Sequence, residues 1–155
     1  MVMNAAAALA VAGTVEGRID AAAEALAGAT VSGMRMEVGR APSGAVVVND
    51  AYNANPDSMR AALQAVARMS ATRRIAVLGA MGELGDPAAG HRRVMDDARS
   101  LGIEVVAVGT DLYGVEPVDD PVVALGPLGD GDVVLVKASR AAGLDRVATA
   151  LLHQS

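Results

Sequence analysis

Apolar residues follow two different spacings along the chain, and the change between them separates expected helices from expected strands. Residues 2–12 are rich in alanine up to Gly13, and residues 18–27 place apolar side chains on one helical stripe, so both segments are expected to be helices. Apolar and polar residues then alternate over 34–39, which is typical of a half-buried strand. The turn that follows leads into a β-branched run at 45–50, so these two strands are expected to form a hairpin or lie side by side.

From residue 45 onward the chain alternates strands and helices. The expected strands are valine-rich and apolar on both faces, which indicates a mostly parallel sheet covered by helices on each side. The sequence therefore predicts an α/β fold with a Rossmann-like sheet, and its loops at the carboxyl ends of the strands are the places for a ligand. The expected strands are 45–50, 74–79, 103–109 and 132–137, and the expected helices are 56–69, 88–101 and 141–152, with an irregular stretch at 110–131.

Composition excludes several classes of protein. With 155 residues, 52% of them apolar, the chain has the size and hydrophobicity of one folded core and not of a disordered tail. No apolar stretch approaches the roughly 20 residues of a membrane span, so no membrane insertion is expected. Cysteine is absent and the start lacks the basic stretch of a secretion signal, which favours the cytoplasm. A net charge of −5 without a basic cluster argues against nucleic acid as a partner.

Polar residues crowd the loop 50–58, which reads DAYNANPDS and follows an expected strand. A turn needs one or two asparagine or aspartate residues, and this loop offers more than that. Such carboxamide and carboxylate groups can bind ribose hydroxyls, or the amide and ammonium groups of a peptide-like ligand. Function is therefore favoured for the loop as a whole, whereas Asn55 taken alone is better explained as the cap of the following helix.

Two further loops follow expected strands. GAMGELG at 79–85 has the spacing G-x-x-G-x-x-G, not the dinucleotide G-x-G-x-x-G, so ligand contact and a tight turn are equally good explanations. Lys137, Ser139 and Arg140 would together suit a carboxylate or phosphate, and Lys137 is the one lysine in the sequence. No P-loop occurs, and His91 and His153 lack metal-ligand spacing, so no metal site is assigned.

Taken together, NDAYNANPDSM (49–59), RRIAVLGAMGELG (73–85), His91 and GDVVLVKASRAAGLDRV (131–147) resemble the C-terminal domain of the Mur ligase family. Within that family the similarity is to the member that joins D-alanyl-D-alanine to UDP-N-acetylmuramoyl-tripeptide. The resemblance covers nearly the whole chain. It implies that residues 1–30 are the helical end of a central ATPase domain and that residues 31–155 are the C-terminal domain of a three-domain, ATP-dependent enzyme.

The resemblance also implies roles for individual residues. ATP would be contacted by Asn4, Arg35, Asp50, Tyr52 and Asn53. The dipeptide would be held by Asn55, Ser58, Lys137, Ser139 and Arg140. No residue of this chain is assigned to catalysis. ATP and Mg²⁺ are the implied cofactors, with the metal ligands and the P-loop in the first two domains, so the chain alone is expected to have no ligase activity.

Two departures from the family pattern stand out. Ala80 occupies a position that is more often acidic, and the stretch 110–131 is shorter than usual.

Other interpretations of the sequence stay open. They are another Mur-type or folylpolyglutamate-type ligase, a stand-alone Rossmann-like nucleotide-binding module in which Asp111 binds the ribose, or a non-catalytic interaction domain. Binding of D-alanyl-D-alanine would separate the proposed ligase from the last two.

Overall fold

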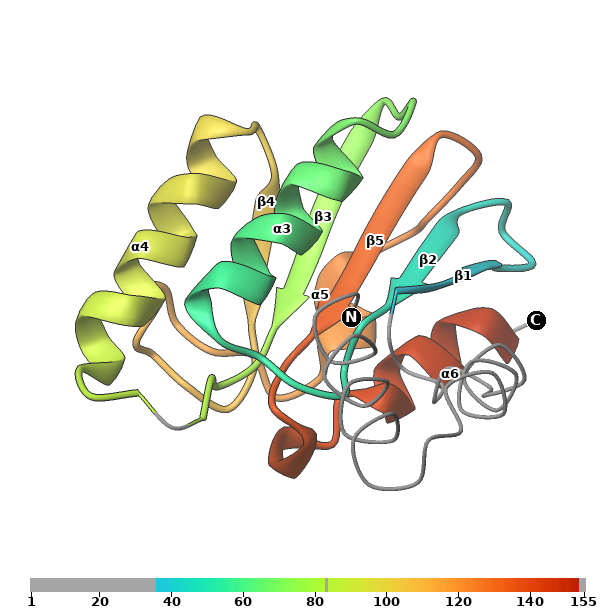
Figure 1. Ribbon diagram of the computed structural model, residues 1–155. Coiled ribbons are helices and arrows are strands. Elements are labelled where there is room, and N and C mark those ends of the chain that lie inside the picture. Colours follow the sequence, from blue (N-terminus) through green and yellow to red (C-terminus); the bar gives the residue numbers. More distant parts are fainter. Residues whose placement is uncertain (1–35, 83, 154–155) are drawn as a thin grey trace, which may run out of the picture. The chain divides into compact units, whose positions relative to one another are not determined.

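The computed structural model describes residues 36–82 and 84–153 (Figure 1). All of these residues lie in the second of the two units into which the chain divides, Gly33–Ser155. The helices expected at 2–12 and 18–27 lie outside the described residues, and so does the predicted domain boundary between residues 30 and 31. That boundary stays a prediction.

A five-stranded sheet forms the centre of the described part, in the order β1-β2-β5-β3-β4. β1 runs antiparallel to β2, and the other neighbours pair in parallel. This arrangement confirms the mostly parallel, Rossmann-like α/β fold, and it confirms that the first two expected strands are neighbours. The strands are β1 (Glu37–Arg40), β2 (Val46–Asn49), β3 (Arg73–Leu78), β4 (Glu104–Ala107) and β5 (Asp132–Lys137).

Helices cover both faces of this sheet, as the valine-rich strands predict. α3 (Pro56–Ala67) and α4 (Pro87–Ser100) pack on one face, where Val133 and Leu135 of β5 meet them. Val134 and Val136 point to the opposite face and pack with α5 (Pro121–Leu125) and α6 (Asp145–His153). Figure 1 shows α3 and α4 in front of the central strands and α5 behind them. In the described part of the chain, no helix is long and apolar enough to cross a membrane.

Two sequence expectations about helices are corrected here. The stretch 110–131 is not wholly irregular, because it contains α5. Asp120 caps this helix by accepting hydrogen bonds from the backbone amides of Val122 and Val123. The helix expected at 141–152 is divided into a short 3₁₀ turn, η1 (Arg140–Ala142), and α6. Gly143 separates them with a φ of +61°, a left-handed conformation that ends a helix.

The first expected strand is also shifted. β1 begins at Glu37, and Val38 is 60% exposed although the alternating pattern predicts that it faces the core. The neighbouring residue on the strand, Gly39, faces α6 instead, since a Cβ built on it would lie 2.6 Å from a methyl carbon of Leu152. Val38 therefore points to the α3 side at the edge of the sheet.

Candidate functional site

The loops singled out by the sequence meet at one edge of the sheet. β2, β5, β3 and β4 are parallel, so their carboxyl ends and the loops that follow open on the same side. The loop after β2 leads to α3 on one face, whereas the loop after β5 leads to η1 and α6 on the other. Ligands of open α/β sheets bind where neighbouring strands send their loops to opposite faces. The carboxyl ends of β2 and β5, with the loops that follow them, are therefore the candidate site.

Backbone hydrogen bonds continue past the strand ends and tie three of these loops together. The amide of Asp50 donates to the carbonyl of Val136 at 2.9 Å, and that of Gly79 donates to the carbonyl of Lys137 at 3.1 Å. The amide of Ser139 donates to the carbonyl of Ala80 at 3.0 Å. The loop 137–140 is thus held between the loops of β2 and β3.

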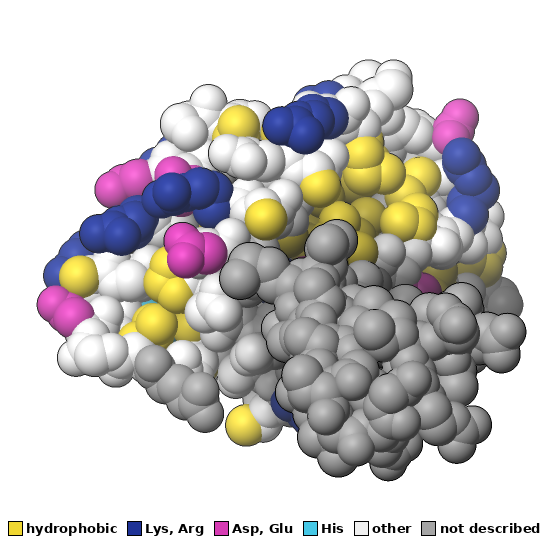
Figure 2. Space-filling view, in the orientation of Figure 1, with side chains coloured by type: hydrophobic (Ala, Val, Ile, Leu, Met, Phe, Trp, Pro, Cys, Tyr) yellow, Lys and Arg dark blue, Asp and Glu magenta, His cyan; other side chains and the backbone are white. Residues whose placement is uncertain are grey.

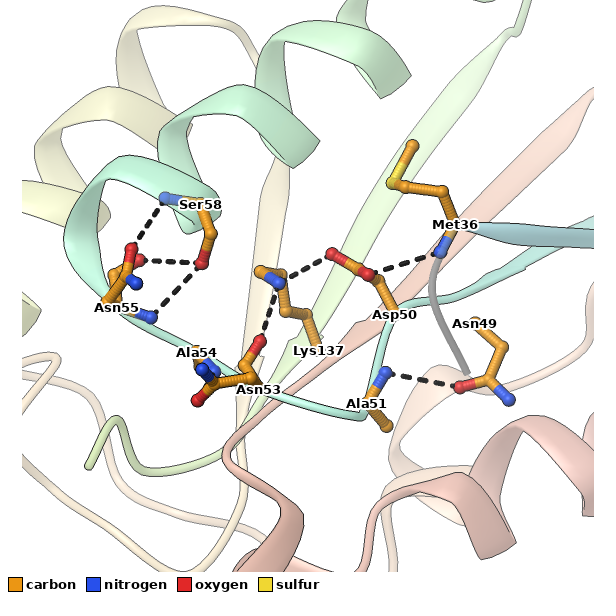
Figure 3. A network of polar contacts seen from close by, with 9 residues as sticks. All are labelled: Met36, Asn49, Asp50, Ala51, Asn53, Ala54, Asn55, Ser58 and Lys137. Carbon is orange, nitrogen blue, oxygen red and sulfur yellow. Dashed lines mark hydrogen bonds and ion pairs between the residues drawn. The ribbon is translucent and has the colours of Figure 1, made fainter. Parts of the chain in front are cut away.

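Lys137 lies beneath the loop 50–58 and not on the surface. Its side chain is 2% exposed, and its ammonium donates to Oδ2 of Asp50 at 2.5 Å and to the carbonyl of Asn53 at 2.8 Å (Figure 3). Asp50, whose side chain is 13% exposed, also accepts a bond from the amide of Met36 through Oδ1 at 3.1 Å. Lys137, which is expected to hold the dipeptide, is thus bonded to Asp50 and Asn53, which are both expected to contact ATP.

Asn55 and Ser58 form a capping box at the start of α3. Oδ1 of Asn55 accepts from the amide of Ser58 at 2.9 Å, and the Ser58 hydroxyl oxygen accepts from the amide of Asn55 at 3.1 Å (Figure 3). Pro56 takes the first helical position, where its missing N–H costs nothing. This confirms the expected cap, and the role of both residues toward a substrate stays a prediction.

A second contact between the loops of β2 and β5 joins Tyr52 and Arg140. The guanidinium carbon of Arg140 lies 5.5 Å from the centre of the Tyr52 ring, within the range of a cation–π interaction. Arg140 and Asn53 are exposed, and Ser139 and Tyr52 are partly exposed. These residues are among the accessible polar groups of the candidate site, whereas Lys137 is buried.

Two buried residues that the sequence did not connect with the site hold the loop after β3. The Tyr113 hydroxyl donates to the carbonyl of Gly79 at 2.8 Å, and burial raises the pKa of that hydroxyl well above its ordinary value. Nε2 of His91 accepts from the amide of Met81 at 3.0 Å. The sequence offers one signal for Tyr113: tyrosine is rare in this chain, with two among 155 residues.

Asn4 and Arg35, the other residues expected to contact ATP, lie outside the described residues. Within 36–82 and 84–153, no group of three or more histidine, cysteine, aspartate or glutamate side chains could hold a metal ion.

The face formed by α3 and α4 carries charges of both signs, interleaved (Figure 2). Arg60 pairs there with Asp97 at 3.0 Å. The absence of a metal site and of a nucleic-acid partner remain predictions.

Comparison with known proteins identifies the class. The family model for the Mur ligase, glutamate ligase domain, matches residues 34–122, more than half of the chain. The chain therefore belongs to the Mur ligase family, as its motifs indicate.

Individual relatives indicate which member of the family this chain resembles. The UDP-N-acetylmuramoyl-tripeptide–D-alanyl-D-alanine ligase of Mycobacterium tuberculosis H37Rv is 40% identical over 97% of this chain and 37% of that protein. The ligase of the same name from Bacillus subtilis is 44% identical over 55% of this chain and 19% of that protein. The chain thus spans less than two fifths of the length of these relatives.

Solved structures agree with the sequence relatives. MurF from Acinetobacter baumannii superposes with a TM-score of 0.70 and 28% identity, over 99% of this chain and 37% of that one. The MurF ligase of Thermotoga maritima, solved in complex with ADP, gives a TM-score of 0.67 and 28% identity, over 80% of this chain and 31% of that one. Both confirm the fold, and the second shows that a similar protein binds an adenine nucleotide.

Proposed function

We propose that this chain is the C-terminal domain of a cytoplasmic, ATP-dependent ligase that joins D-alanyl-D-alanine to UDP-N-acetylmuramoyl-tripeptide during the synthesis of peptidoglycan precursors. One observation supports this most: the loops 50–58 and 137–140 meet at the carboxyl edge of the sheet through the Lys137–Asp50 pair. The relative from M. tuberculosis, whose name states this reaction, is similar over almost the whole of the chain.

Arg140 and Ser139 are the groups best placed to hold the dipeptide carboxylate. Both are accessible, whereas Lys137 is buried and has two acceptors within the protein. A guanidinium can hold a carboxylate through two parallel hydrogen bonds. The stacking of Arg140 on Tyr52 reduces the freedom of a long side chain before the substrate binds, which lowers the entropy that binding costs.

Lys137 acts from beneath this surface. Its ammonium balances the charge of Asp50, which would otherwise repel the phosphates of ATP from the loop that also presents Tyr52 and Asn53. It also fixes the carbonyl of Asn53 and thus the course of the loop. We therefore propose that Lys137 orders both the loop that contacts the nucleotide and the loop that holds the dipeptide. The residues proposed to contact the nucleotide are Asn4, Arg35, Asp50, Tyr52 and Asn53.

The chemistry that these residues serve has two steps. A peptide carboxylate oxygen takes the γ-phosphoryl group of ATP, with ADP as the leaving group. The dipeptide amine then attacks the carbonyl carbon of that acyl phosphate, and the amide forms as phosphate leaves and the amine loses a proton. Holding the dipeptide by its carboxylate leaves its amine free and aligned, and alignment of two reactants supplies much of an enzyme's rate. Mg²⁺ would stabilise the phosphate charge, and we propose from the family resemblance that its ligands belong to the other domains of the enzyme.

The test uses the full-length translation product of the reading frame that contains this chain. Phosphate release from ATP is measured with UDP-N-acetylmuramoyl-tripeptide, with and without D-alanyl-D-alanine. The proposal requires release that depends on the dipeptide. Release that depends on a single amino acid such as glutamate, or no release at all, would overturn it. The 155-residue chain assayed alone is expected to release none, because its sequence has no P-loop.

A matched pair of variants tests the site. Arg140→Ala is expected to raise the KM for D-alanyl-D-alanine by about tenfold or more, since a charged hydrogen-bonding partner is lost. Arg146→Ala, which removes another exposed arginine a few residues along, is expected to leave this KM unchanged. Equal effects of the two substitutions would contradict the role of Arg140.

A further inference from the structure

His91 is buried in α4, and both of its ring nitrogens have partners. The side chain is fully covered, and Nε2 accepts a hydrogen bond from the amide of Met81 at 3.0 Å. Nδ1 lies 2.6 Å from the carbonyl oxygen of Pro87. A backbone amide can only donate and a carbonyl can only accept, so these partners define a neutral ring with its hydrogen on Nδ1. His91 thus connects the first turn of α4 to the loop after β3.

That loop begins with Gly79, Ala80 and Met81, and its backbone is fixed from several directions. Tyr113 donates to the carbonyl of Gly79, and its ring lies edge-on to that of His91, with 4.8 Å between the ring centres. The Met81 side chain is buried in the core beneath α3 and α4. His91 from α4 and Tyr113 from the turn between β4 and α5 therefore hold the two ends of this tripeptide.

The same tripeptide supports the loop 137–140. The carbonyl of Ala80, between the two held residues, accepts from the amide of Ser139 at 3.0 Å. Gly79 lies so close to the loop that a Cβ built on it would be 2.7 Å from the Cβ of Ala138. Residues 79 and 80 are hydrogen-bonded to Lys137 and Ser139, and there is no room for even a methyl group between Gly79 and Ala138. A displacement of residues 79–81 is therefore expected to displace residues 138 and 139 as well.

We infer that His91 is a positioning residue for the dipeptide: through the amide of Met81 and the carbonyl of Ala80, it sets the position of Ser139 and Arg140. This inference rests on the proposed function, which places these two residues at the dipeptide carboxylate. His91 itself touches no substrate. Its effect comes from the fixed geometry that it gives to the groups that do, and misplacement of such groups by a fraction of an ångström weakens binding and slows reaction.

Two substitutions of His91 test its two hydrogen bonds separately. A glutamine side chain places its oxygen near the position of Nε2, so His91→Gln keeps an acceptor for the amide of Met81. An asparagine side chain is shorter, so His91→Asn keeps a donor toward Pro87 and loses the bond to Met81. Both substitutions leave a polar side chain in the same buried place, which makes each the control of the other.

In the full-length enzyme, His91→Asn is expected to raise the KM for D-alanyl-D-alanine about tenfold and to leave the KM for UDP-N-acetylmuramoyl-tripeptide unchanged. His91→Gln is expected to stay within about threefold of the unsubstituted enzyme for both. A purely structural role would lower kcat in both variants through loss of folded protein, with both KM values unchanged, and this result would overturn the inference. Equal dipeptide KM values in the two variants would overturn it as well.

A second measurement does not depend on the reaction. Amide hydrogen exchange in the 155-residue chain is expected to be faster at Met81 and Ser139 in His91→Asn than in His91→Gln, with unchanged exchange at Val134 in the centre of the sheet. If the unsubstituted enzyme does not use D-alanyl-D-alanine but this exchange pattern is found, the proposed function fails and the linkage of His91 to Ser139 stands. If exchange at Ser139 is the same in both variants, the linkage itself is wrong.

Discussion

Replacing Lys137 by methionine tests how much the buried ion pair at the site contributes to the fold. Methionine keeps an apolar stem of similar length and removes the ammonium, so the packing of the stem is largely retained. Asp50 then keeps a charge that is mostly out of water and, among the residues that the structure describes, keeps the hydrogen bond from the amide of Met36. The perturbation therefore isolates the cost of leaving a buried carboxylate without its counter-charge.

The expected loss is about 3 kcal/mol of unfolding free energy. Removing one partner of a buried pair costs roughly 3–5 kcal/mol, and the partial exposure of Asp50 together with its bond to Met36 places this case at the lower end. The exposed pair of Arg40 and Asp130 serves as control. Its atoms are 3.1 Å apart but the side chains are 64% and 89% exposed, so Arg40→Met is expected to cost less than about 1 kcal/mol.

Urea denaturation followed by circular dichroism measures both variants. With a slope of about 2 kcal/mol per molar for a domain of this size, the midpoint of Lys137→Met should fall by about 1.5 M. In the double variant with Asp50→Asn, the two losses should not add, with a coupling of about 2 kcal/mol. A midpoint for Lys137→Met no lower than that of Arg40→Met, or fully additive losses, would refute the reasoning.

Three further predictions concern stability and are measured by the same denaturation. Gly79→Ala is expected to cost about 1–3 kcal/mol because its Cβ would lie 2.7 Å from a neighbouring methyl carbon, whereas Gly85→Ala, with open space around it, should change stability by less than about 0.5 kcal/mol. Asn55→Ala should cost about 1 kcal/mol through loss of the helix cap, and Asn53→Ala should cost less, since the bond of Asn53 to the buried ammonium uses its backbone carbonyl. Tyr113 retains its proton in the folded state above the pH of about 10 at which an unfolded tyrosine loses it, because burial raises its pKa. The stability of the unsubstituted chain relative to Tyr113→Phe should therefore be constant below pH 10 and fall as the pH rises above it, and a constant difference up to pH 11 would contradict this.

Local patterns in the sequence determine most of the elements. The strand expected at 132–137 coincides with β5, and the helix expected at 56–69 begins at the same proline as α3. These predictions succeed because spacing and capping act within a few residues along the chain. The sequence misses α5 although Asp120 and Pro121 are a good cap and first residue, since a five-residue helix is too short for any periodicity.

The tertiary structure alone decides how the site is put together. Asp50 and Lys137 are 87 positions apart, and nothing local to either residue predicts that β5 inserts between β2 and β3. That strand order brings the two loops together, buries Lys137 and leaves Arg140 and Ser139 accessible. The position of α4 relative to the end of β3, in turn, places His91 where its ring accepts a hydrogen bond from the loop after β3.

The sequence by itself thus determined the class of fold, its main elements and the loops at which chemistry is expected. Which side chains of those loops are buried, which are paired and which remain open to a ligand depended on the packing of strands distant in sequence. The physical reason is the range of the forces involved: helix and strand patterns reflect near neighbours, whereas the burial of a charge and its pairing depend on every element that surrounds it.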